Sequence, residues 1–139
     1  MGIQNVVEKD TVFVVEDEMR LYSTLNILLK RTGYQVVICE NGKEAFRKIN
    51  YHLKNNLAID LVLTDIIMPE MDGIQLIFEI NKLNREIPCI AMTGHGNIDM
   101  RIQLIELSCA GYLEKPINAE TLLSEVEHVL EFSKWRKKL

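Results

Sequence analysis

The chain has 139 residues, which is enough for one domain and leaves little room for a second. Its residues are 47% hydrophobic and 26% charged, with only 7 Gly and 3 Pro, so a disordered chain and a collagen-like fibre are both excluded. The formal net charge is −4, and residues 134–139 hold four of the 16 Lys and Arg residues, so the rest of the chain is strongly acidic. An acidic body repels a phosphate backbone, which argues against direct binding of nucleic acid.

The N-terminal segment and the cysteines indicate a reducing compartment. Residues 1–10 contain no basic region followed by an apolar core, and no apolar run approaches the ~18 residues of a membrane helix. Cys39, Cys89 and Cys109 are odd in number and have no C-x-x-C spacing, which does not suit a disulfide framework. We therefore expect a cytoplasmic protein without membrane contact, with an N-terminal extension over residues 1–10, one domain over residues 11–133 and a basic C-terminal tail over residues 134–139.

Five apolar segments of strand length alternate with five segments of helical character along the chain. In chain order, strands are predicted over residues 11–16, 34–39, 59–65, 87–93 and 110–115. Helices are predicted over residues 18–31, 43–54, 73–83, 98–107 and 119 to about 135. In the first helix, Leu21, Leu25 and Leu28 share one face, and Gly33 is placed to end the helix.

Strands that are apolar at nearly every position need both faces of their sheet covered, and helices between successive strands impose parallel pairing with right-handed crossovers. The pattern therefore predicts an α/β fold, a doubly wound (βα)₅ sandwich around a five-stranded parallel sheet. We expect the flavodoxin-like strand order 2-1-3-4-5, in which the first and third strands flank the point where the order reverses. Ligands of such sheets bind beyond the carboxyl ends of the strands, so functional residues are expected there.

Polar residues follow four of the predicted strands. Residues 16–18 (Glu-Asp-Glu) end the first strand, Asp65 ends the third, Thr93 ends the fourth and Lys115 ends the fifth. Carboxylates crowded into one crevice either take up protons or are neutralised by a hard cation, and oxygen ligands of this kind suit Mg²⁺. A solvated loop or acids favoured by the start of a helix would be the plainer explanation of Glu18.

Together these groups match one kind of chemistry. Phosphoryl transfer to a carboxylate needs a nucleophilic Asp, a divalent metal, and cationic and hydroxyl groups that neutralise the charge on the equatorial phosphoryl oxygens. Asp65 is the candidate nucleophile, and Lys115 and Thr93 are the candidate charge-stabilising groups. Lys115 alone would more often be a surface lysine and Thr93 alone an ordinary strand residue, so their joint placement carries the argument.

Four segments of the chain resemble the receiver domain of two-component response regulators, the family of the chemotaxis regulator. They are VVEDE (14–18), LVLTDIIMPEMDG (61–73), AMTGHG (91–96) and AGYLEKP (110–116). They occur in the family's order and at suitable intervals, and the similarity spans about residues 11–133.

This resemblance implies a phosphoacceptor and a metal site. Asp65 would accept the phosphoryl group from the phosphohistidine of a sensor histidine kinase, from a phosphotransfer protein or from a small phosphodonor. Asp17, Asp65 and the main-chain carbonyl of Ile67 would coordinate Mg²⁺ or Mn²⁺, with Glu16 contributing through a water molecule. Glu16 stands where the family more often has Asp, which lengthens one arm of the acidic pair.

The resemblance also implies how the phosphoryl group is sensed. Thr93 would bond one phosphoryl oxygen and Lys115 would pair with another, with a cis peptide bond between Lys115 and Pro116. The shift of Thr93 would open space for the ring of Tyr112, whose rotation reshapes the face of the fourth helix, fifth strand and fifth helix. A downstream effector or a second protomer would read that face. Alternatively, Tyr112 is an ordinary strand aromatic with its hydroxyl in water.

Two positions that flank the path of the hydrolytic water in this family are occupied here by Ile67 and His95. We expect apolar Ile67 to obstruct that water and to prolong the life of the phosphoryl-Asp. His95 would tune the same rate or would be an exposed loop histidine. Gly73, which closes the PEMDG segment, fits either a turn with positive φ or the start of a helix.

Three classes of function follow from these residues. The first is a phosphorylation-dependent switch, which is not an enzyme beyond catalysing its own phosphorylation and dephosphorylation. The alternative is a Mg²⁺-dependent hydrolase that forms an aspartyl-phosphate, but such an enzyme usually has a second Asp where this chain has Ile67. A dinucleotide-binding domain would need G-x-G-x-x-G after the first strand, where this chain has the acidic residues 16–18.

Overall fold

The computed structural model describes residues 10–94 and 96–139, so nine residues of the predicted N-terminal extension, and His95, lie outside the described residues. The strands are β1 (Thr11–Val15), β2 (Gln35–Cys39), β3 (Leu61–Asp65), β4 (Cys89–Thr93) and β5 (Gly111–Glu114). The helices are α1 (Met19–Thr32), α2 (Gly42–Lys54), α3 (Gly73–Leu83), α4 (Ile98–Glu106) and α5 (Ala119–Lys137). Strands and helices alternate as the sequence predicted.

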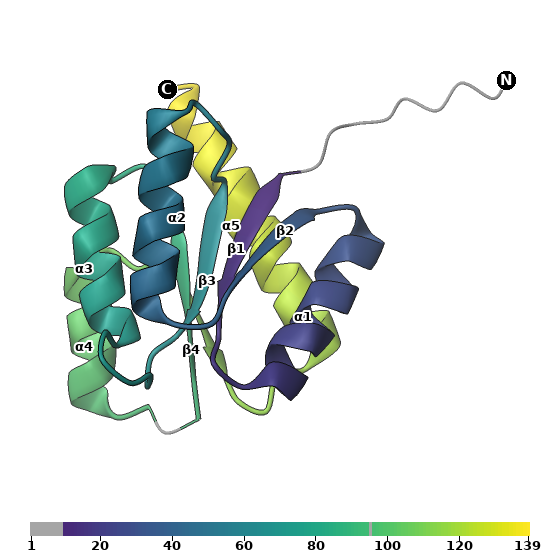
Figure 1. Ribbon diagram of the computed structural model, residues 1–139, viewed down its shortest axis with the longest axis vertical. Coiled ribbons are helices and arrows are strands. Elements are labelled where there is room, and N and C mark those ends of the chain that lie inside the picture. Colours follow the sequence, from purple (N-terminus) through teal and green to yellow (C-terminus); the bar gives the residue numbers. More distant parts are fainter. Residues whose placement is uncertain (1–9, 95) are drawn as a thin grey trace, which may run out of the picture.

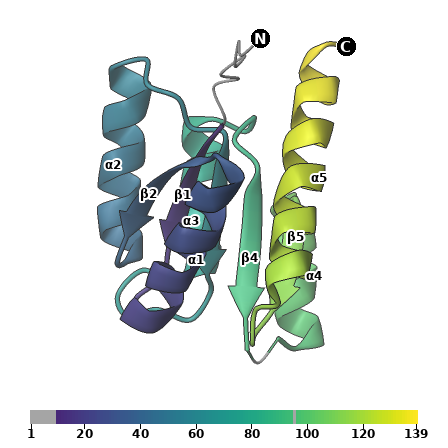
Figure 2. The same ribbon diagram turned by 90° about the vertical axis from the view of Figure 1, so that its right-hand side faces the viewer.

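The five strands form one parallel sheet in the order β2-β1-β3-β4-β5. Helices α1 and α5 cover one face of this sheet, and α2, α3 and α4 cover the other (Figures 1 and 2). This arrangement confirms the predicted doubly wound, flavodoxin-like sandwich. It also places β1 and β3 side by side, so the segments that follow them begin at the same edge of the sheet.

The three inner strands explain why the sheet has two covered faces. Every residue of β1, β3 and β4 is buried, whereas the edge strands β2 and β5 each keep residues that are partly or fully exposed. Side chains of successive strand residues point to opposite faces, so a fully buried strand contributes to both core layers at once. Cys39 and Cys89 are buried in the core and Cys109 is half-buried, and all three are free thiols. Burial raises the pKa of Cys39 to about 12.

Helix α1 begins and ends one residue later than predicted, and its buried face is turned slightly. Gly33 follows the helix with a φ of 104°, a left-handed conformation that glycine adopts at low cost. Leu25 and Leu29 are fully buried, whereas Leu21 and Leu28 are half-buried. The centre of the buried face is therefore the line of Leu25 and Leu29. Leu21 and Leu28, which were predicted to share this face with Leu25, lie toward its sides.

Helix α5 extends two residues beyond its predicted end, to Lys137. Lys134, Arg136 and Lys137 thus lie in its last turn, where cations interact favourably with the helix dipole. The ammonium group of Lys134 also forms an ion pair with Asp10 at 2.7 Å, which ties the end of α5 to the start of β1.

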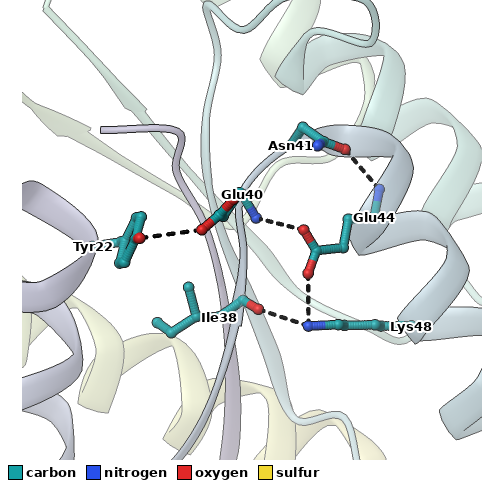
Figure 3. A network of polar contacts seen from close by, with 6 residues as sticks. All are labelled: Tyr22, Ile38, Glu40, Asn41, Glu44 and Lys48. Carbon is teal, nitrogen blue, oxygen red and sulfur yellow. Dashed lines mark hydrogen bonds and ion pairs between the residues drawn. The ribbon is translucent and has the colours of Figure 1, made fainter. Parts of the chain in front are cut away.

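Figure 3 shows a polar network at the turn between β2 and α2, made of Tyr22, Ile38, Glu40, Asn41, Glu44 and Lys48. The Asn41 side chain accepts a hydrogen bond from the Glu44 N–H at 2.8 Å and thereby caps α2. The Glu44 carboxylate accepts the Glu40 N–H at 3.1 Å and pairs with Lys48 at 2.8 Å. Lys48 also donates to the Ile38 carbonyl at 2.9 Å, so one lysine holds α2 to β2.

This network predicts a pH-dependent contribution to stability from Glu44. The hydrogen bond with Lys48 holds the pKa of Glu44 below its ordinary value of 4.5. A lowered pKa in the folded state stabilises the fold above the unfolded pKa, and this contribution is lost as pH falls through the folded pKa. In urea unfolding, Glu44→Gln should therefore be less stable than the wild type at neutral pH, and the difference should vanish in acid. A difference that is the same at both pH values would contradict this expectation.

Candidate functional site

The predicted site residues meet at the carboxyl edge of the sheet. Glu16 and Asp17 directly follow β1, and Asp65 is the last residue of β3. One carboxylate oxygen from each of these three residues lies within 4.8 Å of the others. Glu16 and Asp65 are buried, whereas Asp17 is exposed. The parallel pairing of β1 with β3 explains the cluster, because both strands end at the same edge.

Lys115 completes this cluster from the segment after β5. Its ammonium nitrogen lies 2.9 Å from Glu16 Oε1 and 3.2 Å from Asp65 Oδ1, so one cation bridges two buried carboxylates. The second oxygen of Glu16, Oε2, accepts the N–H of Glu18 at 3.0 Å. Both oxygens of Glu16 therefore have partners within the protein. The Lys115–Pro116 peptide bond is cis.

Burial and charge shift the pKa values of these groups. Burial raises the pKa of Asp65, and the attraction of Lys115 only partly offsets this rise. Burial also raises the pKa of Glu16, against the lowering effect of its hydrogen bonds with Lys115 and the Glu18 N–H. For Lys115, burial alone would lower the pKa, but the hydrogen bond and charge of Glu16 and the charge of Asp65 outweigh it and raise the pKa. One ammonium group, that of Lys115, bridges two of the three carboxyl groups, and this arrangement would favour a further cation.

Thr93 and Tyr112 lie on the neighbouring strands β4 and β5. Thr93, the last residue of β4, is buried, and its carbonyl accepts the Lys115 N–H at 2.8 Å. Tyr112 pairs with Ala91 across β4 and β5, and its ring is half-buried. The structure therefore brings Thr93 and Lys115 together through the backbone, and Tyr112 lies further back along β5.

The segment from Ile66 to Asp72 connects Asp65 to α3. Ile67 is 61% exposed, whereas Met68 is buried. Gly73 does not adopt a positive φ, and the left-handed residue of this segment is Glu70, with a φ of 68°. Gly73 is instead required by close approach, because an added Cβ would overlap the main-chain oxygen of Asp65. The positive-φ alternative for Gly73 is therefore wrong, and its place at the start of α3 is confirmed.

The carboxylate cluster fits a small hard cation. Its donors are oxygens, which Mg²⁺ prefers, and they come from two adjacent strand ends. Because both oxygens of Glu16 already accept hydrogen bonds, Asp17 and Asp65 are the better placed of the three to contribute directly. A hollow of about 180 Å³ lies away from this cluster, between the end of α3, the start of β4 and the end of α5. No helix of the described residues is long and apolar enough to cross a membrane.

Comparisons with known proteins agree with this geometry. The profile of the response regulator receiver domain matches residues 12–127. The transcriptional regulatory protein GlrR of Escherichia coli (strain K12) is 33% identical over 132 residues, which cover 91% of this chain and 29% of GlrR. NtrX from Brucella abortus, solved in complex with ATP, has a TM-score of 0.81 at 29% identity, over 92% of this chain and 28% of NtrX. A CheY-like receiver domain protein from Methanospirillum hungatei JF-1 has a TM-score of 0.84 at 24% identity, over 92% of this chain and 98% of that protein, and supports the fold.

The fold and the acidic edge define a flavodoxin-like α/β domain with a candidate cation site. The chain belongs to the response regulator receiver domain family of two-component signal transduction. It spans about 29% of the length of GlrR, so the activity and targets of a longer protein do not carry over to it directly. Several of its relatives, GlrR and ZraR among them, are named as transcriptional regulatory proteins.

Two residues near this site were not singled out from the sequence. Gly96 belongs to the AMTGHG motif, but the motif gave no sign of its contact with the Tyr112 ring. Arg101 lies over the ring of Tyr112, and no sequence signal indicates this contact, because it depends on how α4 packs beside β5.

Proposed function

We propose that this chain is a phosphorylation-dependent switch in which Asp65 accepts a phosphoryl group. The observation that carries the proposal is the position of Asp65, a buried carboxylate bridged to Lys115 and bordered by two further acids at the edge of the sheet. A sensor histidine kinase or a phosphotransfer protein would supply the phosphoryl group from a phosphohistidine. A small phosphodonor would serve in place of this protein donor. A cytoplasmic location belongs to this proposal, because three free thiols suit a reducing compartment.

The chemistry follows from the charges around Asp65. A carboxylate oxygen of Asp65 attacks phosphorus, an O–P bond forms, and the bond from phosphorus to the leaving imidazole nitrogen breaks. Lys115 pairs with one phosphoryl oxygen and the Thr93 hydroxyl donates to another, which neutralises charge in the transition state. Asp17, Asp65 and the Ile67 carbonyl would hold Mg²⁺ or Mn²⁺, with Glu16 contributing through water, and the ion would supply positive charge that stabilises the phosphoryl group.

The signal would leave the site through Thr93 and Tyr112. A phosphoryl group adds roughly −1.5 to −2 charges and strong acceptor oxygens, which draw the Thr93 hydroxyl inward. Tyr112 then shifts, and the face of α4, β5 and α5 changes in a population shift between two pre-existing states. Exposed isoleucines on α4 support this face as the contact for a downstream effector or a second protomer: Ile98, Ile102 and Ile105.

Acetyl phosphate tests the proposed phosphorylation. After incubation with acetyl phosphate and Mg²⁺, we expect intact-mass spectrometry to show one added phosphoryl group on the wild type. Asp65→Asn should show none, and it should remain folded because the substitution removes a buried charge that burial destabilises. An equal adduct on both proteins, or none on the wild type, would contradict the assignment. The hydrolase alternative lacks support, because Ile67 offers no titratable group for turnover.

Ile67 should control how long the phosphoryl group survives. Because the Ile67 side chain is largely exposed, its replacement should alter the path of the hydrolytic water without unfolding the protein. We expect Ile67→Asn to lose the phosphoryl group several-fold faster than the wild type, and Ile67→Leu, the matched apolar control, to lose it at the wild-type rate. The decay of the phosphorylated fraction after removal of acetyl phosphate measures the rate at which each protein loses the phosphoryl group. Equal decay in all three proteins would show that Ile67 does not obstruct the hydrolytic water. The decay rate of His95→Ala tests the second proposed rate-tuning position in the same way.

A further inference from the structure

The ring of Tyr112 has a cationic neighbour on α4. The guanidinium carbon of Arg101 lies 4.6 Å from the centroid of this ring, within the range of a cation–π contact. Arg101 forms no ion pair with a carboxylate among residues 10–94 and 96–139. Within the described part of the chain, no ion pair competes for this guanidinium, which is available to the aromatic face.

Gly96 contacts the same ring from the segment between β4 and α4. A Cβ added at Gly96 would overlap the Tyr112 hydroxyl and would lie 3.1 Å from the Tyr112 Cζ atom. It would also lie 3.2 Å from the Thr93 methyl carbon. Since the φ of Gly96 is not in the left-handed range, an added Cβ would conflict with the present position of the Tyr112 ring and not with the backbone conformation. Gly96 thus lies where Thr93 and Tyr112 come close together.

We propose that Gly96 and Arg101 together form a seat for the Tyr112 ring, and that Arg101 transmits the position of this ring to α4. The proposal rests on the proposed function, in which Tyr112 responds to phosphorylation. Gly96 leaves the space that the hydroxyl end of the ring occupies, and the Arg101 guanidinium holds its face. Arg101 is a positioning residue, because it acts on Tyr112 and has no contact with the acidic cluster.

The arrangement links the site to the exposed side of α4 in two steps. Thr93 and Tyr112 both border Gly96, so an inward shift of Thr93 changes the space that the ring can fill. The ring in turn contacts Arg101, which lies within the first turns of α4. A cavity of about 140 Å³ between α4 and β5, lined by Arg101, Leu104, Ile105, Cys109, Gly111 and Tyr112, gives the ring room to move. Movement of the ring would therefore move or loosen α4.

Fluorine NMR of the full chain labelled with 3-fluorotyrosine tests the seat. The Tyr112 resonance is assigned as the one missing from Tyr112→Phe. Arg101→Gln should lower the ratio of seated to released Tyr112 ring by roughly two- to fivefold, the range expected for an exposed cation–π contact. Arg101→Lys keeps the charge and should restore part of the seated population. Arg47→Gln removes the same charge from α2 and should leave the Tyr112 resonance unchanged. A Tyr112 resonance that is identical in the wild type and Arg101→Gln would overturn the seat.

Gly96→Ala separates a shared seat from two independent effects. The added methyl group should displace the ring, so Arg101→Gln in the Gly96→Ala background should change the Tyr112 resonance less than it does in the wild-type background. Equal effects of Arg101→Gln in both backgrounds would contradict a common seat. Each variant is also checked by thermal unfolding, and a displaced resonance counts only for proteins that unfold cooperatively.

Hydrogen exchange tests the coupling to α4. With acetyl phosphate, the amides of residues 98–106 should change their exchange rates in the wild type, and this response should fall by at least half in Arg101→Gln while Asp65 still takes up phosphate. An undiminished response in Arg101→Gln would overturn the coupling. A wild type that takes up no phosphate would instead contradict the proposed function, and the NMR comparison of the unphosphorylated proteins would still decide whether the seat exists.

Discussion

Lys115→Met is expected to be among the most destabilising substitutions at the candidate site. Methionine retains the apolar stem but removes the ammonium group that bridges Glu16 and Asp65 at 2.9 and 3.2 Å. Removing one partner of a buried ion pair leaves uncompensated charge, and we expect the free energy of unfolding to fall by about 3 kcal/mol at neutral pH. Urea unfolding measures this loss.

The loss should depend on pH in a defined direction. Without Lys115, the pKa values of Glu16 and Asp65, already raised by burial, should rise further. A carboxyl with a raised folded pKa contributes stability that is present below its unfolded pKa and is lost as pH rises through the folded pKa. Lys115→Met should therefore approach wild-type stability in acid, where both carboxyls are protonated.

Lys43→Met is the matched control for this experiment. Lys43 forms an exposed ion pair with Glu70 at 3.6 Å, and its loss should cost less than about 1 kcal/mol at any pH. If Lys115→Met were as mild as Lys43→Met, or if its effect were constant with pH, Lys115 would not be the counter-ion of the buried acids.

Gly73→Ala should be similarly destabilising, for a steric reason. An added Cβ would overlap the main-chain oxygen of Asp65 and would lie 2.8 Å from the Cα atom of Ile66. These are backbone atoms that cannot rotate away, and the Gly73 N–H also donates to the Ile66 carbonyl at 2.7 Å. We expect a loss of about 3 kcal/mol in urea unfolding, at the upper end of the cost of overpacking, together with slower phosphorylation because Asp65 is displaced.

Gly94→Ala provides the comparison for Gly73→Ala. A Cβ at Gly94 would have Lys115 Cβ as its nearest neighbour, at 3.8 Å, which is an ordinary van der Waals contact. Gly94→Ala should therefore unfold close to the wild type. Equal stability of the two alanine variants would show that α3 can withdraw from the end of β3 without cost.

The layer arrangement was predictable because it depends on patterns that tertiary contacts reinforce. Most residues of β1, β3 and β4 are apolar and all of them are buried, and only a sheet covered on both faces accommodates them. The convergence of Asp65, Thr93 and Lys115 followed from the same reasoning, because parallel strands end at one edge.

Other features depend on distances that no periodicity encodes. The spacing of Leu21, Leu25 and Leu28 did not show that Leu29 is fully buried together with Leu25, because a helix can turn slightly about its own axis on the sheet. Likewise, the sequence marked Gly73 as special but did not distinguish a positive φ from a close approach to Asp65. The contact of Arg101 with Tyr112 joins α4 to β5 through a long side chain and leaves no local signature.

Borohydride reduction of the phosphorylated protein tests the central claim most directly. Reduction of an aspartyl-phosphate converts that residue to homoserine, so peptide mass spectrometry locates the acceptor. After incubation with acetyl phosphate and Mg²⁺, the account predicts homoserine at position 65 and unmodified aspartate at position 17. Homoserine at another acidic residue, or intact aspartate at position 65 in a protein that carries the phosphoryl group, would contradict it.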